Sequence, residues 1–304
     1  MSRTFVMSSS DITADLRRVL DLDLGRNFVS VPWAHNGNFD LDKNKSMSPQ
    51  NKVRKIRLGH LKSDRFAKLA HARQPQLKYN GGPLLQHVEV FTIFWGSVWQ
   101  KQPALISLAH NINDFFSFIL VSPLIDHLAE YNVPARSLSI GHGKLTGTTT
   151  LATEPGPLID DSDIQAMLKH WIATEAGFPR PNANTLYFIY FPPGTSITLE
   201  GDSSCEKFGG YHDAIDDKIF YAVEPFCLSS GGNLSQLDFF TLTSSHELCE
   251  AITDPIPGAG WYWFRDKEHQ GEIGDICEAA PNAEERMGSF LVQREWSNAK
   301  TRCV

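Results

Sequence analysis

A histidine and two glutamates lie close together between Thr243 and Pro255: His246, Glu247 and Glu250. His246 and Glu250 are four residues apart, so on a helix both side chains project from one face and can bind the same ion. Glu247 lies beside them, within reach of a metal-activated water. This pattern corresponds to the His-Glu-x-x-His zinc helix, with Glu250 in the place of the second histidine. The spacing therefore predicts a zinc site with His246 and Glu250 as ligands and Glu247 as general base.

The residues around this trio predict the helix that would carry it. Apolar residues recur with helical spacing and would face the protein interior, and Pro255 would end the helix. A carboxylate on such a buried face is costly unless it is paired or bound to a metal. We therefore expect either a metal site or a metal-free pair of His246 and Glu250. The apolar residues of this face are Leu237, Phe240, Leu248, Ala251 and Ile252.

A catalytic zinc site with three protein ligands and an open position needs one more ligand. Glu272 and Asp275 could supply it from a glycine-flanked loop that follows the helix, and Asp275 is the preferred candidate. These two acids could instead bind Ca²⁺ together with Asp254, because clusters of oxygen ligands suit calcium. Asp254 could also only end the helix before Pro255, or support a metal ligand from outside.

The composition bounds the class of protein. A chain of 304 residues, 41% of them hydrophobic, can bury a full core in one large domain or two smaller ones. Its 28 basic and 35 acidic residues give a net charge of −7, which argues against general nucleic-acid binding. No run of about 18 apolar residues occurs, so we expect no membrane span. The first thirty residues carry four aspartates, Asp11, Asp15, Asp21 and Asp23, and lack an apolar segment, so we see no signal peptide.

Residues 1–76 are predicted to form an N-terminal extension outside the catalytic body. Ile12–Leu22 and Arg57–Ala72 have helical patterns, and the polar stretch Asn36–Asn51 between them is typical of a loop or of disorder. The stretch Lys52–Lys78 is strongly basic and contains a single acid. We interpret it as a solvated arm, or as a strip that docks on an acidic partner or a membrane surface.

Residues 77–304 are predicted to form the catalytic domain, because strands and helices alternate along them. This alternation favours an α/β layered domain with a mixed sheet. The expected strands are Val88–Gly96, Ser137–His142, Leu186–Phe191 and Phe220–Pro225. The expected helices, besides the metal helix, are Leu105–Leu120, Val121–Tyr131 and Asp160–Glu175.

Five cysteines allow two disulfides and one free thiol. No Cys-x-x-Cys occurs, so a zinc ribbon or a thioredoxin-type site is unsupported. We expect Cys249, on the metal helix, to be the free cysteine. Cys205–Cys227 and Cys277–Cys303 are plausible pairs, which would imply an oxidising compartment. The missing signal peptide points to the cytoplasm instead, so the sequence leaves both locations open.

Two further histidines, His142 and His212, lie on predicted polar loops. Isolated loop histidines are more often satisfied by hydrogen bonds than bound to a metal, and we expect this of both.

Several motifs of residues 77–304 occur in the same order in one known family. They are Tyr-Asn-Gly-Gly-Pro…Val-Phe-Thr-Ile-Phe-Trp-Gly at 79–96, Tyr-His at 211–212, Ala-Val-x-Pro at 222–225, Ser-His-Glu-Leu-x-Glu-Ala-x-Thr-Asp-Pro at 245–255, Glu-Ile-Gly-Asp-x-Cys at 272–277 and Trp-Ser-Asn-Ala…Cys at 296–303. The chain thereby resembles the EXORDIUM-like, phosphate-induced proteins, and more closely their bacterial and fungal relatives, which look like zinc metallopeptidases. The resemblance implies a zincin-like active-site helix, a secreted protein, and His212 as a catalytic donor to the transition state. Plant members lack the His-Glu pair, so the resemblance does not make the metal a requirement of the fold.

These observations lead to one main hypothesis and two alternatives. The main hypothesis is a zinc-dependent hydrolase, a metallopeptidase acting on peptides. A metal-dependent enzyme acting on a small molecule would use the same residues. A non-catalytic carbohydrate- or cell-wall-binding module is the third, as the plant relatives imply, with exposed Trp261, Tyr262 and Trp263 stacking on sugars. The substrate and the oligomeric state are not predicted.

Overall fold

The computed structural model describes residues 74–227, 234–266, 269–278 and 280–304. In these ranges the chain is mixed α/β, with five α-helices and several sheets. The predicted N-terminal extension, residues 1–76, lies almost entirely outside the described residues, and so do its two predicted helices and most of its basic stretch.

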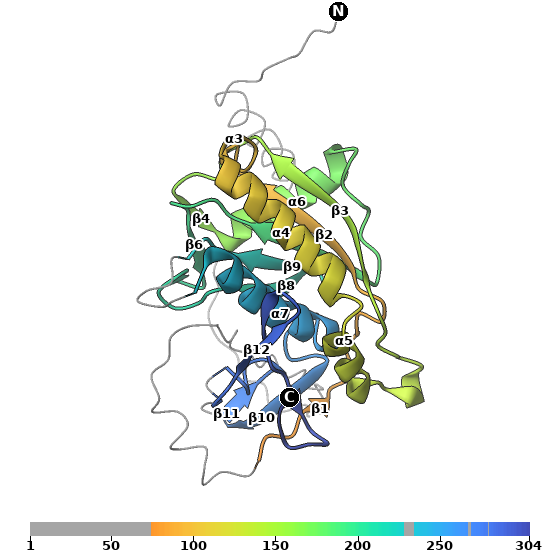
Figure 1. Cartoon of the computed structure of the whole chain (residues 1–304). Helices are drawn as coiled ribbons and strands as arrows, with labels where there is room; N and C mark the ends of the chain where they lie inside the picture. Colours follow the sequence, from red (N-terminus) through yellow and green to blue (C-terminus); the bar gives the residue numbers. More distant parts are fainter. Residues whose placement is uncertain (1–73, 228–233, 267–268, 279) are drawn as a thin grey trace, which may run out of the picture. The chain divides into compact units, whose positions relative to one another are not determined.

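A five-stranded mixed sheet with the strand order β3-β2-β5-β9-β8 lies at the centre of the described chain (Figure 1). Four of its strands run parallel, and β8 pairs antiparallel with β9 at one edge. Of the three inner strands, β2 and β5 are apolar on both faces, as strands covered on both sides must be. The bounds are β2 (Glu89–Trp95), β3 (Lys144–Leu151), β5 (Thr185–Tyr190), β8 (Tyr211–Ile215) and β9 (Ile219–Glu224).

Alternate residues of the central strands belong to two separate apolar cores. On β2, Val90 and Phe94 join one core, which we call the first core, while Phe91 and Ile93 join the second. The first core also contains the apolar faces of α4, α5 and α7, and the second contains that of α6. Helices therefore pack on both faces of the sheet. Their bounds are α3 (Val98–Lys101), α4 (Pro103–Ile119), α5 (Pro123–Leu128), α6 (Asp161–Thr174) and α7 (Gln236–Thr253).

Helix α7 is the helix that the metal motif predicts. The Ser235 side chain caps its start by accepting a hydrogen bond from the backbone N–H of Asp238. Every residue from Phe240 to Thr253 is buried, polar residues included. Each buried leucine or isoleucine of its apolar face contributes about 1.5–3 kcal/mol to the free energy of folding. The helix ends before Asp254 and Pro255, as predicted.

Smaller sheets surround the central one. The sheet with the order β1-β10-β11 consists of Lys78–Tyr79, Trp261–Asp266 and His269–Gly271. The sheet β4-β6-β7 consists of Leu158–Asp160, Ser196–Leu199 and Asp202–Ser203. Two hairpins are β12 (Glu284–Met287) with β13 (Phe290–Gln293), and β14 (Trp296–Ser297) with β15 (Arg302–Cys303). Short 3₁₀ helices cover Ala129–Tyr131 and Pro134–Arg136.

The strand expected at Ser137–His142 is wrong. Only Leu138 makes an isolated bridge there, and the strand begins at Lys144. The backbone N–H of Gly141 donates to Gln86 O, and that of Gly143 to Leu120 O, so the segment uses its hydrogen bonds on a loop and a helix end.

The expectation of an exposed aromatic platform at Trp261, Tyr262 and Trp263 is also wrong. Tyr262 and Trp263 are buried, and Trp263 belongs to the first core. Trp261 is half-buried, and its indole N–H donates to Tyr131 O while the ring packs on Tyr79. These rings therefore pack within the protein.

The predicted cysteine pairing is confirmed. Cys205 and Cys227 form one disulfide, Cys277 and Cys303 form another, and Cys249 is free and buried. Two disulfides are typical of proteins that fold in an oxidising environment.

No single helix among the described residues is both long and apolar enough to cross a membrane. Helices Pro103–Ile119 and Pro123–Tyr131 together meet the criteria of length and composition, with a bend of 49° between them.

Candidate metal site

Helix α7 is anchored to the central sheet by Glu224, the last residue of β9. The hydroxyls of Thr243 and Ser244 donate to its two carboxylate oxygens at 2.6 and 3.0 Å. Ser244 Oγ also lies 2.6 Å from the hydroxyl of Tyr190 on the neighbouring strand β5. Burial raises the pKa of Glu224 well above its ordinary value. These bonds fix the rotation of α7 about its axis one turn before His246.

His246, Glu247 and Glu250 all lie at the buried side of α7, where at most 2% of each residue is exposed. His246 Nε2 lies 3.2 Å from Glu250 Oε2, without hydrogen-bond geometry. The two side chains are therefore brought together as the i, i+4 spacing predicts.

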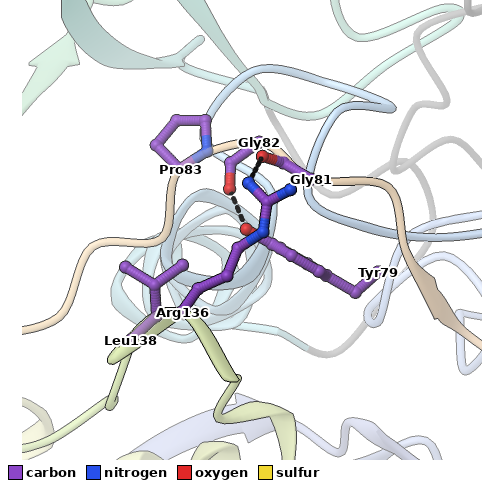
Figure 2. Close-up of a pocket in the computed structure, with 6 residues that line it drawn as sticks. All are labelled: Tyr79, Gly81, Gly82, Pro83, Arg136 and Leu138. Carbon is purple, nitrogen blue, oxygen red and sulfur yellow. Dashed lines mark hydrogen bonds between the residues drawn. The ribbon is translucent and has the colours of Figure 1, made fainter. Parts of the chain in front are cut away.

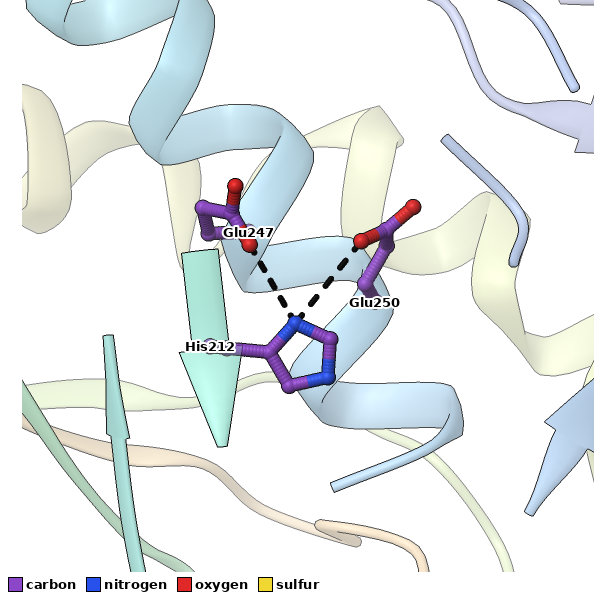
Figure 3. A group of neighbouring side chains, drawn as sticks. All are labelled: His212, Glu247 and Glu250. Carbon is purple, nitrogen blue, oxygen red and sulfur yellow. Dashed lines mark hydrogen bonds and ion pairs between the residues drawn. The ribbon is translucent and has the colours of Figure 1, made fainter. Parts of the chain in front are cut away.

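His212 reaches the same place from β8. It pairs across the sheet with Ala222, a residue of the first core, so its side chain faces α7. Its Nδ1 lies 3.2 Å from Glu247 Oε2 and 3.7 Å from Glu250 Oε2, and Figure 3 shows the ring turned towards both carboxylates. The expectation of a lone histidine on a polar loop is thus wrong for His212. It holds for His142, whose Nε2 lies 2.8 Å from Asp126 Oδ1 near the surface.

The loop after β11 brings both predicted acids to the site. The backbone N–H of Asp275 donates to Glu250 Oε1 at 3.0 Å, and Asp275 Oδ1 lies 4.0 Å from His246 Nε2. Glu272 Oε1 lies 3.4 Å from His212 Nε2. Gly274 allows this approach, because a Cβ atom there would lie 2.5 Å from His246 Nδ1. Asp275 thus lies beside His246, while Glu272 lies beside His212.

Two overlapping groups of side chains have the geometry of metal ligands. His246, Glu250 and Asp275 offer ligand atoms that all lie within 4.8 Å of one another, and so do His212, Glu247 and Glu250. Four side-chain atoms in or beside these groups are buried without a hydrogen-bond partner among the described residues. They are His246 Nε2, Glu247 Oε1, Glu272 Oε1 and Asp275 Oδ1. Native proteins rarely bury such atoms without a reason, and a bound ion is one such reason.

These groups could hold a metal ion, and their donor atoms fit a divalent cation. One imidazole nitrogen with two carboxylate oxygens suits zinc and other divalent transition metals. Asp254 is a candidate calcium ligand in the sequence. It accepts hydrogen bonds from the backbone N–H groups of Gly258 and Gly260. It therefore closes the turn after α7, and it belongs to neither group.

The sequence did not indicate Gln293, which orients His246. Gln293 Oε1 lies 3.2 Å from His246 Nδ1, and its amide nitrogen donates to Gly274 O at 2.7 Å. The backbone N–H of Gln293 donates to the hydroxyl of Ser245, next to His246 in α7. No local pattern marks this glutamine, because the strand β13 that carries it contacts α7 only in the folded chain.

Two buried glutamates were missed as well. Glu295 is fully buried, and neither carboxylate oxygen has a hydrogen-bond partner among the described residues. Burial and the nearby Glu295 raise the pKa of the Cys249 thiol well above its ordinary value. Glu224 carried a usable signal, since it is the single charged residue of the otherwise apolar strand Ile219–Glu224.

The pKa directions follow from burial and from the mutual contacts. Burial raises the pKa values of Glu247 and Asp275 above their ordinary values, and that of Glu272 in the same way. Burial alone would lower the pKa values of His212 and His246, but the surrounding carboxylates outweigh it and raise them. Glu250 has a lowered pKa despite its burial, because both histidines flank it. Negative charge is therefore most stable on Glu250.

A separate hollow of about 550 Å³ lies at the surface between the end of β1, with the residues that follow it, and the second 3₁₀ helix (Figure 2). Arg136 donates to Gly81 O at 3.0 Å and lies over the ring of Tyr79. None of its lining residues belongs to either group of candidate metal ligands.

The chain matches no protein-family model, and no curated protein matches it. The resemblance to the EXORDIUM-like proteins therefore stays a prediction that rests on the motifs themselves.

Proposed function

We propose that the protein is a zinc-dependent hydrolase of the zincin type and that its substrates are peptides. The observation that carries this proposal is the convergence of His246, Glu250 and Asp275 on one buried point, with Glu247 beside them. These three residues would hold the ion. Zinc, when bound, would polarise the scissile carbonyl and lower the pKa of the attacking water.

Glu247 would act as the general base. Its Oε1 has no hydrogen-bond partner among the described residues and lies 4.0 Å from His246 Nε2, so a free oxygen faces the three ligands. Burial raises the pKa of Glu247, which makes its carboxylate a stronger base. Glu247 would accept the proton of the water and pass it to the leaving amine. His212 holds the other oxygen of Glu247 at 3.2 Å, and its action as a donor to the transition state stays a prediction.

Burial of the site favours a second candidate function, a closed structural metal site. The side chains of His246, Glu250 and Asp275 are at most 3% exposed. Structural zinc sites are closed, whereas catalytic sites keep one position open to substrate. An ion held there would tie α7 to the loop that carries Asp275. An enzyme acting on a small molecule would use the same residues. The carbohydrate-binding alternative loses its support from exposed Trp261, Tyr262 and Trp263.

Metal content and turnover together test the proposal. Zinc would be measured by mass spectrometry on protein purified without a metal-binding tag, beside the variant His246→Ala. We expect zinc in the wild type and its loss in His246→Ala. A screen of peptides and esters should then find a substrate, and Glu247→Gln should lower its turnover about 10²–10⁴-fold while the fold is kept. Zinc binding with turnover unchanged in Glu247→Gln would instead favour the structural site.

A further inference from the structure

The two histidines of the site have matching surroundings, although they come from different elements. His246 Nδ1 faces Gln293 Oε1, and the amide nitrogen of Gln293 donates a hydrogen bond to Gly274 O. The second bond fixes the amide, so the atom facing His246 is an oxygen, which can only accept. His246 therefore donates from Nδ1, and in the neutral ring Nε2 presents a lone pair.

His212 is held in the same way on β8. Its Nε2 lies 3.1 Å from the backbone oxygen of Asp254 and 3.4 Å from Glu272 Oε1. A carbonyl oxygen only accepts, so Nε2 donates and Nδ1 presents a lone pair in the neutral ring. A histidine whose one N–H is bound to an oxygen acceptor, and whose other nitrogen faces carboxylate oxygens, as His212 Nδ1 faces Glu247 and Glu250, is arranged as metal-bound histidines are.

Both lone pairs face the same carboxylate oxygen. Glu250 Oε2 lies 3.2 Å from His246 Nε2 and 3.7 Å from His212 Nδ1. Two ligands of one zinc ion, each bound at about 2.0–2.2 Å in a tetrahedral site, lie about 3.3–3.6 Å apart. The two separations are close to this range. A cation between them would stabilise this arrangement, and in its absence a second proton on each ring takes that role, as the raised pKa values of both histidines indicate.

The remaining ligands divide between the two histidines. Asp275 Oδ1 lies 4.0 Å from His246 Nε2, whereas Glu247 Oε2 lies 3.2 Å from His212 Nδ1. Glu250 is the residue that the two groups share. Its other oxygen, Oε1, accepts the backbone N–H of Asp275, so Oε2 is the oxygen placed to join them.

The charge of the site also fits two ions. Four carboxylates surround the two histidines, and the side chains of all four are at most 5% exposed. When all four are ionised, as metal binding requires of its ligands, one divalent cation balances two of these charges and leaves two buried, which is costly. Two divalent cations balance all four. The four carboxylates are those of Glu247, Glu250, Glu272 and Asp275.

We propose that this site binds two divalent cations with Glu250 as the bridging ligand. His246, Glu250 and Asp275 would bind the first ion. His212, Glu250 and Oε2 of Glu247 would bind the second. This inference rests on the proposed zinc site and extends it. Hydrolases that use two metal ions hold them about 3.5–4 Å apart, bridged in this manner. Glu247 Oε1 stays free to accept a proton.

The number of bound ions tests the inference. The full chain would be stripped with a chelator, dialysed against Zn²⁺ and analysed for zinc per chain by mass spectrometry. We expect two zinc ions in the wild type, one in His212→Ala and none in Glu250→Ala. His142→Ala is the matched control, because it removes a histidine–carboxylate pair at the surface and should keep both ions. The chain loaded with Mn²⁺ should also show the electron paramagnetic resonance spectrum of a coupled pair.

The outcomes separate this inference from the proposed function. One zinc in the wild type, with no coupled Mn²⁺ spectrum, would overturn the second position and leave the zinc hydrolase intact. No zinc in the wild type would overturn both. If His212→Ala fails to fold by circular dichroism, His212→Gln takes its place, and the wild-type count and the Mn²⁺ spectrum still decide.

Discussion

Gln293 controls how His246 presents itself to an ion, although it belongs to neither group of candidate ligands. Its amide oxygen accepts from His246 Nδ1, and its amide nitrogen is fixed by Gly274 O. The same glutamine also bonds through its backbone N–H to Ser245 in α7. One residue therefore sets both the tautomer and the rotation of the His246 ring.

Replacing this amide should weaken metal binding without removing a ligand. In Gln293→Leu, His246 Nδ1–H loses its acceptor and the ring is free to turn. We expect zinc affinity to fall about 10–100-fold, which is the usual effect of losing such a partner. The measurement is a competition titration of the chelator-stripped chain against a coloured zinc chelator.

Two further variants separate this role from a general loss of packing. Gln293→Glu keeps an acceptor for His246 and should retain most of the affinity. Gln100→Leu removes an amide that donates to Thr150 O at an exposed position, and it should bind zinc as the wild type does. Equal affinities of Gln293→Leu and the wild type would show that Gln293 does not orient His246.

At this scale the sequence predicts what lies within one helix. His246, Glu247 and Glu250 could be placed together because a helix turns once in about four residues. Asp275 and Glu272 were recognised as acids on a loop, but only the fold divides them between His246 and His212. Gln293 and Glu295 could not be found, because nothing in their own segments distinguishes them from other polar residues.

Of the three elements that carry candidate ligands, α7 and the loop of Asp275 are each tied to a different part of the chain. Helix α7 is fixed to β9 and β5 through Glu224 and the hydroxyls of Thr243 and Ser244. The loop that carries Asp275 is followed at once by Cys277, which is bonded to Cys303. The loop is thereby linked to the C-terminal hairpin that precedes the end of the chain.

Breaking this disulfide should disturb the metal site more than breaking the other one. The two disulfides span 26 and 22 residues, so by loop entropy each should contribute about 3 kcal/mol to the free energy of unfolding. Only Cys277–Cys303 lies next to a metal ligand. We expect Cys277→Ser/Cys303→Ser to weaken zinc binding at least tenfold, and Cys205→Ser/Cys227→Ser to change it little. Urea unfolding and zinc titration of both double variants measure the two effects.

The matched loss of stability is the internal control of that comparison. If both double variants lose similar stability and similar zinc affinity, then the effect on zinc is general and the loop is not held by its disulfide. If neither loses zinc affinity, Asp275 is placed by its hydrogen bond to Glu250 alone.

Strands with a continuous apolar run were predicted correctly from the sequence, whereas the polar strand at the edge of the sheet was not. The inner strands β2 and β5 were found because burial on both faces gives a continuous apolar run. Strand β8 was interpreted as a loop, since His212 and Asp213 are polar and two glycines precede them. In the structure Asp216 and Asp217 have positive φ in the turn that joins β8 to β9, and aspartate tolerates this conformation. The Asp-Asp pair before an apolar run was the one sequence sign of this hairpin.

The whole molecule brings the site together at one end of its sheet. Glu224 is the last residue of β9, and His212 pairs with Ala222 near the same end. Open α/β sheets commonly place ligands beyond the carboxyl ends of their strands. The ligands come from a strand, a helix and a loop, so their meeting depends on topology, which no local pattern encodes.

The pH dependence of stability should reverse when the metal is removed. Burial raises the pKa of Asp254 from its ordinary value of 3.8 to about 7, although the N–H groups of Gly260 and Gly258 partly offset this. The pKa values of Asp275, Glu272 and the two histidines are raised as well. These groups bind protons more tightly in the folded chain than in the unfolded chain. Their stabilisation is complete below the unfolded pKa and is lost as pH rises through the folded pKa.

The chelator-stripped protein should therefore unfold at a lower temperature at pH 8 than at pH 5, with most of the Asp254 effect between about pH 4 and 7. Glu250, whose pKa is lowered, acts in the opposite sense but is outnumbered. Zinc-loaded protein should melt at a higher temperature than the stripped protein. This difference should grow with pH, because ligands must lose their protons to bind an ion. Melting curves at both pH values, with zinc and with chelator, measure this difference. A stripped protein that is more stable at pH 8 than at pH 5 would contradict the raised pKa values of these buried groups.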